Sequence, residues 1–449
     1  MKTKLLLTFF LLAFSINANS QNCISNAEYK LIEDRCAVNA AMLGLNTPSS
    51  ADRSKAGTLL SWPLKPKSSL NDCSYYHISA YVDQNTATGA FKDFNCGTNS
   101  YDGHGGTDIS IWPFNFLKMD SSLVEIVAAA PGIILDKHDG EFDKNCTANT
   151  LTANYVVIQH ADGSRTNYWH MKKNSVLTKA IGQSVAVGEY LGLVGSSGSS
   201  SGPHLHFEVW SGATSATRVD PYTGTCNSLN TSTWWASQKP YKETAVVKVS
   251  TNTTDVLVPA CPGTEVSNES KVFQIPFQGP GLPAGYAKFY MFLRDEIASG
   301  TGDMKIKNPD GSTFVSWTYA STVDRKTLMW GWSKKLPTTA GKYTFEVTYN
   351  GSTCSTQFDV TTASGLSIIG PSKPFQVYPN PSTGMVVFEG LDGQDLQVEI
   401  YSELGKMVYQ APLNSPKLMV NLEAYSGLLF YQIKNSNGQV QSGKLLLEK

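Results

Sequence analysis

The stretch GSSGSSSGPHLHFEVW, residues 195–210, determines how the central part of this chain folds. It begins as a run of Gly and Ser and ends in alternating polar and apolar residues, which predicts a half-buried β-strand. Side chains two apart in a strand point to the same side, so His204, His206 and Glu208 share one face, opposite an apolar face. Two imidazoles facing one way, beside a loop with little side-chain bulk, indicate a metal site in an open groove.

Composition is typical of a folded, β-rich protein with several domains. A chain of 449 residues predicts about three domains, at roughly 150 residues each. Lys and Arg total 36 against 37 Asp and Glu, and this balance argues against a nucleic-acid-binding protein, which would carry a basic patch. Hydrophobic residues make up 41% of the chain, too many for a disordered protein.

The first twenty residues have the three parts of a secretory signal peptide. Lys2 and Lys4 form the charged region, an apolar run covers 5–16, and small residues at 18–20 precede an expected cut before Gln21. The apolar run is too short for a transmembrane helix, and no later segment reaches that length. The sequence therefore predicts an exported, soluble protein without a transmembrane segment, whose signal peptide is residues 1–20.

All eight cysteines follow the signal peptide. An even number in an exported chain favours disulfides, and no Cys-x-x-Cys pair is present to support a structural zinc site. The connectivity of eight cysteines cannot be derived from their order alone. We expect one particular bond, Cys261–Cys354, because these two cysteines stand alone in their region of the sequence.

The segment 21–58 is predicted to contain a short helix over residues 24–44. Ser25 and Glu28 fit a capping box at its start. Three residues are expected on one apolar stripe: Leu31, Ile32 and Cys36. The segment is either an N-terminal cap or a propeptide that covers the groove.

The rest of the chain predicts an all-β, mostly antiparallel protein. Short apolar runs between Gly, Asn and Asp turns cover 59–240, which contains all seven histidines. The segment 245–362 alternates strongly and has Trp residues for a core, which favours an immunoglobulin-like β-sandwich. A Ser/Gly-containing linker at 363–373 leads to a small, cysteine-free β-sandwich at 374–449.

The histidine-containing domain offers the ligands of a catalytic zinc site, which needs three protein ligands and one position for water. His104 and Asp108 lie in YDGHGGTDISIW, where Gly105 and Gly106 favour a tight loop over a helix. Such a loop could fold both side chains onto one ion. His206 would complete a His/Asp/His set.

Two further histidines, His170 and His204, are candidates for positions beside the metal. In SRTNYWHMKK, alternation puts Tyr168 and His170 on one face and Trp169 on the other. Each motif is weak by itself, since a lone His-x-His is more often a hydrogen-bonded pair, but their combination favours a metal site. The other histidines are interpreted as structural: His77, His138 and His160.

Four motifs, within residues 95–225, resemble those of lysostaphin/LytM-type zinc metallopeptidases in the same order: HGGTDI at 104–109, HADGSRTNYWH at 160–170, VGEYLGLVGSSGSSSGPHLHFEV at 187–209 and VDP at 219–221. The resemblance implies a compact antiparallel β fold with a groove floored by the sheet. It implies one Zn²⁺ per chain, bound by His104, Asp108 and His206. It also implies that His170 and His204 are catalytic.

In such a site zinc activates water and polarises a peptide carbonyl, so a base and an oxyanion donor are needed. We assign His204 as the general base, because its strand places it beside His206. His170 would donate a hydrogen bond to the oxyanion. The reverse assignment of the two roles stays open. The substrate groove is predicted to include five residues: Tyr168, Gly195, Ser196, Ser197 and Gly198.

The tail at 374–449 resembles the type A C-terminal sorting domain of the type IX secretion system, found in certain Gram-negative bacteria. The resemblance rests on VYPNPSTGMVVFEGL from Val377, followed by VEIYSELGKMVYQ and a terminal GKLLLEK. It implies that the secretion machinery binds this tail. It also implies export across the inner and outer membranes, followed by release or attachment at the cell surface.

An enzyme carried past the outer membrane cannot readily reach its own cell wall. The sequence therefore predicts a secreted zinc metalloendopeptidase that cuts peptidoglycan cross-bridges of other bacteria. A zinc protease acting on Gly-rich extracellular proteins is one alternative, and the small residues of the Gly/Ser loop suit both substrates. The other alternative is a non-catalytic surface protein that binds or adheres through the same scaffold.

Overall fold

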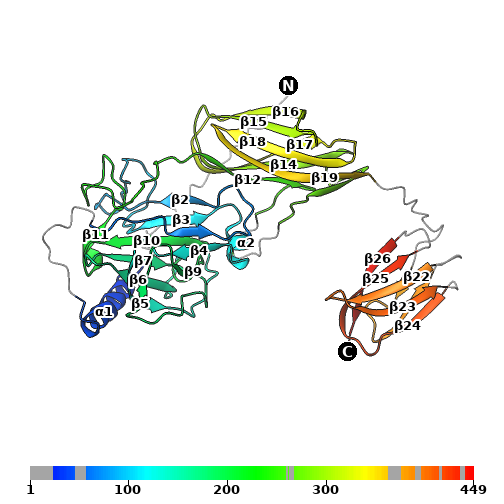
Figure 1. Cartoon of the computed structure of the whole chain (residues 1–449), viewed down its shortest axis with the longest axis horizontal. Helices are drawn as coiled ribbons and strands as arrows, with labels where there is room; N and C mark the ends of the chain where they lie inside the picture. Colours follow the sequence, from blue (N-terminus) through cyan, green and yellow to red (C-terminus); the bar gives the residue numbers. More distant parts are fainter. Residues whose placement is uncertain are drawn as a thin grey trace, which may run out of the picture. The chain divides into compact units, whose positions relative to one another are not determined.

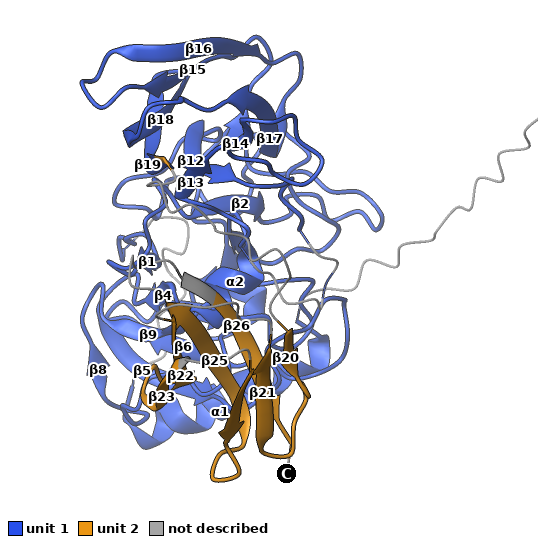
Figure 2. Ribbon diagram, turned by 90° about the vertical axis from the view of Figure 1, so that its right-hand side faces the viewer, with its two compact units in different colours: residues 1–361 blue, residues 362–449 orange. Residues whose placement is uncertain are grey.

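The computed structural model describes most of the chain, in these segments: 24–45, 57–258, 261, 267–362, 376–389, 396–413, 417–434 and 440–448. The chain divides into two compact units, 1–361 and 362–449, coloured separately in Figure 2. The predicted signal peptide, Cys23 and the linker at 363–373 lie outside the described residues. Among the described helices, none is long and apolar enough to cross a membrane.

The first part of unit 1 is built on an eight-stranded antiparallel sheet (Figure 1). Across the sheet, with β11 (Arg218–Val219) beside β10, the order is β2 (Tyr76–Ala80), β3 (Thr107–Ile111), β10 (His204–Trp210), β7 (Arg165–Trp169), β6 (Tyr155–Gln159), β5 (Gly132–His138) and β8 (Ser184–Val185). A second sheet has the order β1 (Leu64–Pro66), β4 (Val124–Val127) and β9 (Tyr190–Leu193). Two short helices connect strands here: α2 (Asn115–Asp120) and the 3₁₀ helix η2 (Ser215–Thr217).

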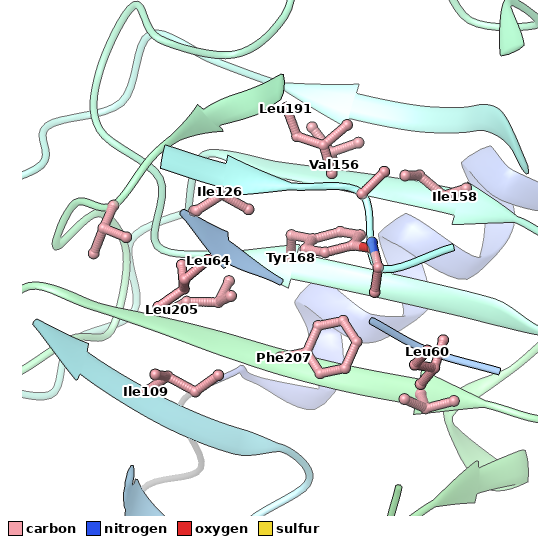
Figure 3. Packing of buried hydrophobic residues seen from close by; sticks show 14 of the residues in the cluster. Leu60, Leu64, Ile109, Ile126, Val156, Ile158, Tyr168, Leu191, Leu205 and Phe207 are labelled. Atoms are coloured by element: carbon pink, nitrogen blue, oxygen red, sulfur yellow. The ribbon is translucent and has the colours of Figure 1, made fainter. Parts of the chain in front are cut away.

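The apolar face of the large sheet packs against the small sheet and forms the main core of this part. Leu205 and Phe207 of β10 are fully buried in that core. Figure 3 shows them with Ile109 of β3 on the large sheet and with Leu64 and Ile126 on the small sheet. The alternation predicted for β10 is thus confirmed, and its apolar side chains are held between two layers.

Helix α1 (Asn26–Met42) packs against the opposite face of the large sheet. Its buried residues Ile32 and Cys36 lie in one apolar cluster with Trp169 of β7 and Trp210 of β10. The predicted stripe is wrong for Leu31, which is 52% exposed. The helix therefore covers part of the face to which the polar residues of β10 point.

The start of α1 follows the predicted capping box only in part. The Ser25 hydroxyl accepts a hydrogen bond from the Glu28 backbone N–H at 3.1 Å, as expected of an N-cap. The Glu28 carboxylate, however, accepts from the Ala153 backbone N–H at 3.0 Å. Its partner is thus in the loop before β6, because the helix is docked on the sheet there.

The second part of unit 1 is a two-sheet β-sandwich. One sheet has the order β12 (Ala245–Asn252), β14 (Tyr286–Glu296) and β17 (Arg325–Lys335). The other has the order β13 (Val272–Ile275), β19 (Ser352–Thr362), β18 (Gly341–Tyr349), β15 (Thr301–Lys307) and β16 (Thr313–Ala320). Every second residue of β18 from Tyr343 is buried, as its alternation predicts. The division at residues 240–245 remains our prediction.

Three disulfides are present among the described cysteines: Cys73–Cys354, Cys96–Cys226 and Cys146–Cys261. The predicted Cys261–Cys354 bond is wrong. Each of these two cysteines pairs with a cysteine from the first part of unit 1, because the sandwich packs against that part. Cys36 is a buried thiol on α1.

Unit 2 is a small β-sandwich of the kind predicted for the tail. One sheet has the order β20 (Gln376–Tyr378), β21 (Met385–Glu389) and β24 (Lys417–Asn421). The other has the order β23 (Met407–Leu413), β22 (Leu396–Ser402), β25 (Gly427–Lys434) and β26 (Val440–Leu447). Phe388 and Ile400, from different sheets, are both fully buried in its core. The mostly antiparallel, all-β architecture expected for the chain is confirmed.

Candidate metal centre and active site

Three side chains predicted as metal ligands meet at one point on the large sheet. The ligand atoms of His104, Asp108 and His206 all lie within 4.8 Å of one another. Oδ1 of Asp108 is 3.2 Å from Nε2 of His104 and 2.8 Å from Nδ1 of His206. They meet because Asp108 on β3 lies directly opposite His206 on β10. Two imidazole nitrogens and one carboxylate oxygen form a donor set that suits zinc and leaves a fourth position for water.

Hydrogen bonds on the far side of each ring orient the two imidazoles. Nδ1 of His104 lies 2.7 Å from the Tyr81 carbonyl oxygen, which can only accept, so Nδ1 carries the proton. Nε2 of His206 lies 3.0 Å from Oε1 of Glu208 and donates to that carboxylate. Each ring therefore presents its unprotonated nitrogen to the shared point, as a metal ligand must.

The two glycines of HGGTD are required by close packing behind the centre. A Cβ on Gly105 would lie 2.6 Å from Oε1 of Glu208 and from the Arg218 guanidinium. A Cβ on Gly106 would lie 2.8 Å from Nε2 of His206. The segment before β3 is a loop, as predicted, and side chains at these positions would push His206 and its partner carboxylate out of place.

Glu208 is a fully buried carboxylate that holds His206 from behind. Besides His206, it accepts from Nε1 of Trp210 at 2.7 Å and Nε of Arg218 at 3.3 Å, and from the Tyr29 hydroxyl of α1. Burial alone would raise its pKa, but the Arg218 guanidinium and the hydrogen-bond donors lower the pKa to about 2. Glu208 is therefore ionised at neutral pH, and α1 contributes directly to the support of the metal centre.

Asp108 is also ionised, and it is 6% exposed. Burial would raise the pKa of this carboxyl, but the imidazoles of His104 and His204 hold the pKa well below its ordinary value. Tyr101 stacks on the His104 ring at a centroid distance of 4.2 Å, and its hydroxyl lies 3.4 Å from Oδ2 of Asp108. The centre thus combines one ionised carboxylate with the ring nitrogens of two imidazoles.

The two histidines predicted to be catalytic lie beside the three ligands. The ring centroids of His170 and His204 are 4.7 Å apart, and Nε2 of His204 is 3.5 Å from Oδ1 of Asp108. Nδ1 of His204 donates to the Gly202 carbonyl at 2.7 Å, and Nδ1 of His170 donates to the Ser197 carbonyl at 2.7 Å. Both rings are therefore held in the tautomer that carries its proton on Nδ1.

The predicted alternation around His170 is wrong. Trp169 lies on the metal face, with its ring 5.6 Å from that of His206, whereas Tyr168 lies in the apolar core. β7 ends at Trp169, and His170 has a φ of +64°, which turns its side chain back toward the metal face. Periodicity could not predict this reversal, because it depends on a left-handed residue just beyond the strand.

Tyr168, which we expected in the substrate groove, is fully buried, and its hydroxyl accepts from the Ala129 backbone N–H at 2.8 Å. It supports the core and does not reach the groove. The loop Gly195–Gly198 lies close to His170, since Ser197 supplies the carbonyl that binds it. Ser196 and Ser197 are fully buried and donate to the carbonyls of Asn145 and Met171. A role for Gly195, Ser196, Ser197 and Gly198 in binding substrate stays a prediction.

Sequence reasoning placed Glu208 on the face of the two histidines of β10 but assigned it no role, and it missed Arg218 and Tyr29 as parts of the site. Nothing in the local sequence connects Tyr29 with this centre, 179 residues away along the chain.

Two sequence families match parts of this chain. Residues 117–221 match Peptidase family M23, and residues 376–448 match the secretion system C-terminal sorting domain. The chain thus contains an M23 peptidase domain of the lysostaphin/LytM type and a type IX sorting domain. The first match includes His170, His204 and His206 but begins after His104 and Asp108.

Individual relatives match over short segments. An uncharacterized metalloprotease of Buchnera aphidicola is 39% identical over 19% of this chain and 19% of its own length. The peptidoglycan DD-endopeptidase ShyA of Vibrio cholerae is 48% identical over 12% of each chain. This chain thus spans a fifth or less of these curated relatives. The catalytic domain of lysostaphin from Staphylococcus simulans is 22% identical, over 28% of this chain and 78% of that domain, with a TM-score of 0.20. A score this low adds nothing to the fold described above.

Proposed function

We propose that this protein is a secreted zinc metalloendopeptidase that cuts peptide bonds in the peptidoglycan cross-bridges of other bacteria. The observation that carries the proposal is the convergence of His104, Asp108 and His206 within 4.8 Å, with two more buried histidines alongside. An M23 peptidase domain in the same part of the chain supports it. A peptidoglycan endopeptidase among the relatives supports the choice of substrate.

The residues present fit a zinc ion. Two neutral imidazoles and one ionised carboxylate are common zinc ligands, and each imidazole is oriented by a hydrogen bond on its far side. When bound, zinc would supply Lewis-acid chemistry by polarising the scissile carbonyl and acidifying water. We propose His104 Nε2, His206 Nδ1 and the Asp108 carboxylate as its ligands, with one ion per chain.

His204 is proposed as the general base. Its Nε2 lies 3.5 Å from Oδ1 of Asp108, and its Nδ1 is engaged with the Gly202 carbonyl, so Nε2 is the atom that can accept a proton. That atom is therefore next to the ligand set, where the attacking water must lose its proton. The same bond to Gly202 holds the ring in position as its charge changes.

His170 is proposed to stabilise the oxyanion and to help the leaving amine take up a proton. Its Nδ1–H is bound to the Ser197 carbonyl, so Nε2 can donate a hydrogen bond only when the ring is protonated. The two histidines must then differ in protonation state during the reaction, with His204 neutral and His170 positive. This requirement predicts a bell-shaped dependence of kcat/KM on pH.

The sorting domain supports an extracellular role. Its match covers residues 376–448, and we propose that it binds the type IX machinery of a Gram-negative cell and leads to release or surface attachment. A peptidase delivered beyond the outer membrane meets the walls and proteins of its surroundings before its own wall. The substrate proposed is therefore the peptidoglycan of other bacteria.

The test is to incubate purified protein with cell walls that differ in cross-bridge composition and with a Gly-rich structural protein. We expect wall turbidity to fall and new amino termini to form, both abolished by a chelator and restored by zinc. Asp108→Asn should abolish the activity. His138→Gln changes a histidine outside the centre, whose Nε2 lies 2.7 Å from Oε1 of Glu141, and should retain it. Cleavage of the structural protein alone would instead support the second substrate class. Retention on walls without any cleavage would support an adhesion protein.

A further inference from the structure

The middle β-sandwich of unit 1 is fixed against β2, the edge strand of the sheet that bears the metal site (Figure 1). The Cys73–Cys354 disulfide joins the segment before β2 to β19 of the sandwich. The Arg294 guanidinium on β14 donates to the Ser74 hydroxyl at 3.1 Å and to the Tyr76 carbonyl at 3.3 Å. A covalent bond and a buried cation therefore hold the sandwich at this edge.

Apolar contacts extend this interface toward β10. Phe292 of the sandwich packs against Phe114 and Trp112, just after β3, with ring centroids 5.4 and 6.3 Å apart. Asn115, the first residue of α2, donates to the Pro203 carbonyl at 3.4 Å, directly before β10 begins. The sandwich thus contacts the end of the sheet at which β10 begins, with His204 as its first residue.

A continuous polar surface leads from the metal site to β2. Ser110 of β3 lies opposite both His204 of β10 and His77 of β2, and residues directly opposite in antiparallel strands share a face. The Ser79 hydroxyl of β2 accepts from the Ser110 hydroxyl at 3.1 Å and donates to the Asp108 carbonyl at 3.3 Å. A peptide lying across the metal site would meet β2 on this side.

Lys326, on β17 of the sandwich, stands at the end of this surface. Its exposed ammonium donates to the Ser79 carbonyl at 2.7 Å, which leaves further N–H groups for a ligand. Its neighbouring acids are already paired, Asp324 with a lysine at 2.7 Å and Glu296 with an arginine at 2.6 Å. Within the described part of the chain, no carboxylate lies within salt-bridge distance of this ammonium.

The charge of Lys326 interacts with groups on the metal side of the sheet. Burial lowers the pKa of Lys326, and carboxylates that include Asp93 and Asp108 oppose this change. Burial, with the charges of Lys326 and His204, lowers the pKa of His77 to about 4. An anion that binds beside this ammonium would stabilise its charge.

We propose that Lys326 is a specificity-determining residue that binds a carboxylate of the peptide substrate, so that the middle β-sandwich forms one wall of the groove. This inference rests on the proposed peptidase function and narrows its substrate to peptides with a free carboxylate near the scissile bond. Peptidoglycan stem peptides carry such carboxylates, and a pure glycine bridge does not. The β-sandwich would then select the substrate, and the histidine domain would cut it.

The test uses two peptides, identical except that one bears a free carboxylate and the other the corresponding carboxamide. We expect the zinc-loaded full chain to prefer the carboxylate peptide in kcat/KM by about fivefold or more, mainly through KM, and less so at high salt. Lys326→Met should remove the preference and Lys326→Arg should keep it. Lys335→Met, an exposed lysine at the end of the same strand, serves as the matched control and should match the parent protein.

Equal cleavage of both peptides by the parent protein, or a preference that survives in Lys326→Met, would overturn the inference while the peptidase function stands. Cleavage of neither peptide would speak against the peptidase function for these substrates. In that case the inference is decided by equilibrium binding to the chelator-treated full chain. Binding of the carboxylate peptide must weaken at least about fivefold in Lys326→Met, relative to the carboxamide peptide, for the inference to hold.

Discussion

Glu208→Gln tests whether a buried carboxylate controls the metal affinity of this protein. The substitution keeps the size of the side chain but removes its charge and replaces one acceptor oxygen by a donor. Glu208 accepts hydrogen bonds from His206 and Tyr29 at Oε1 and from Trp210 and Arg218 at Oε2. Among these four partners, only the Tyr29 hydroxyl can turn to accept from an amide. At least one buried donor must therefore lose its acceptor.

The size of the effect can be worked out from these contacts. Loss of a carboxylate that orients a metal-bound histidine lowers metal affinity by about 10–100-fold, because the ring is held less well in the required tautomer and orientation. Removal of one partner from a buried ion pair costs about 3–5 kcal/mol of folding free energy. The Arg218 side chain is 24% exposed and can gain some hydration, so we expect the lower end, about 3 kcal/mol.

Two measurements on the full chain separate these effects. Competition with a chromophoric chelator gives the zinc dissociation constant, and urea unfolding of the metal-free protein gives the free energy of unfolding. We expect both to change in Glu208→Gln. Glu125→Gln, in a half-buried carboxylate on β4 of the small sheet, removes the same charge away from the centre and should change neither.

Unchanged zinc affinity in Glu208→Gln, with the protein folded, would refute the argument that this carboxylate orients His206. A loss of stability without a loss of affinity would mean that Glu208 only anchors Arg218 and α1. A tenfold or larger loss of affinity at retained stability would assign Glu208 to the metal centre alone.

Three further predictions follow from other parts of unit 1. His204→Ala should lower kcat at least about 100-fold and abolish the acidic limb of the pH–rate profile, while His170→Ala should abolish the basic limb; wild-type turnover in either variant would contradict its role. The buried carboxyl of Asp220 has a pKa raised by burial to about 7, above its ordinary value, so its contribution to stability is present below about pH 4 and is lost as the pH rises toward 7. Between about pH 4 and 7 the parent protein should therefore lose up to about 4 kcal/mol of unfolding free energy through this group. Urea titrations of Asp220→Asn should show that this loss is absent. Phe207→Ala, which empties a fully buried site between the two sheets, should cost about 3–5 kcal/mol in the same assay, and a cost under about 1 kcal/mol would mean that the core can close over the gap.

Much of the candidate site could be predicted from local patterns. Strict alternation in HLHFEVW puts His204, His206 and Glu208 on one face in any half-buried strand, because side chains alternate sides along a β-strand. Gly105 and Gly106 disfavour a helix between His104 and Asp108 and predict the loop that is observed. Such inferences succeed because they depend only on residues adjacent in the chain.

Other features depend on which segments pack together, and only the tertiary structure decides them. The Cys261–Cys354 prediction failed because the sandwich packs against β2, which brings Cys354 next to Cys73. The reversal at His170 arises from one left-handed residue at the end of a strand, where periodicity no longer applies.

The sequence by itself thus determined the candidate metal ligands of this protein, the strand that presents His206 and the sorting tail. The tertiary structure decided what surrounds these ligands. Tyr29 reaches Glu208 from α1, and Lys326 reaches Ser79 from the β-sandwich. The physical reason is that local side-chain patterns set which way a residue faces, whereas the partner it meets depends on sheet register and on packing between distant segments.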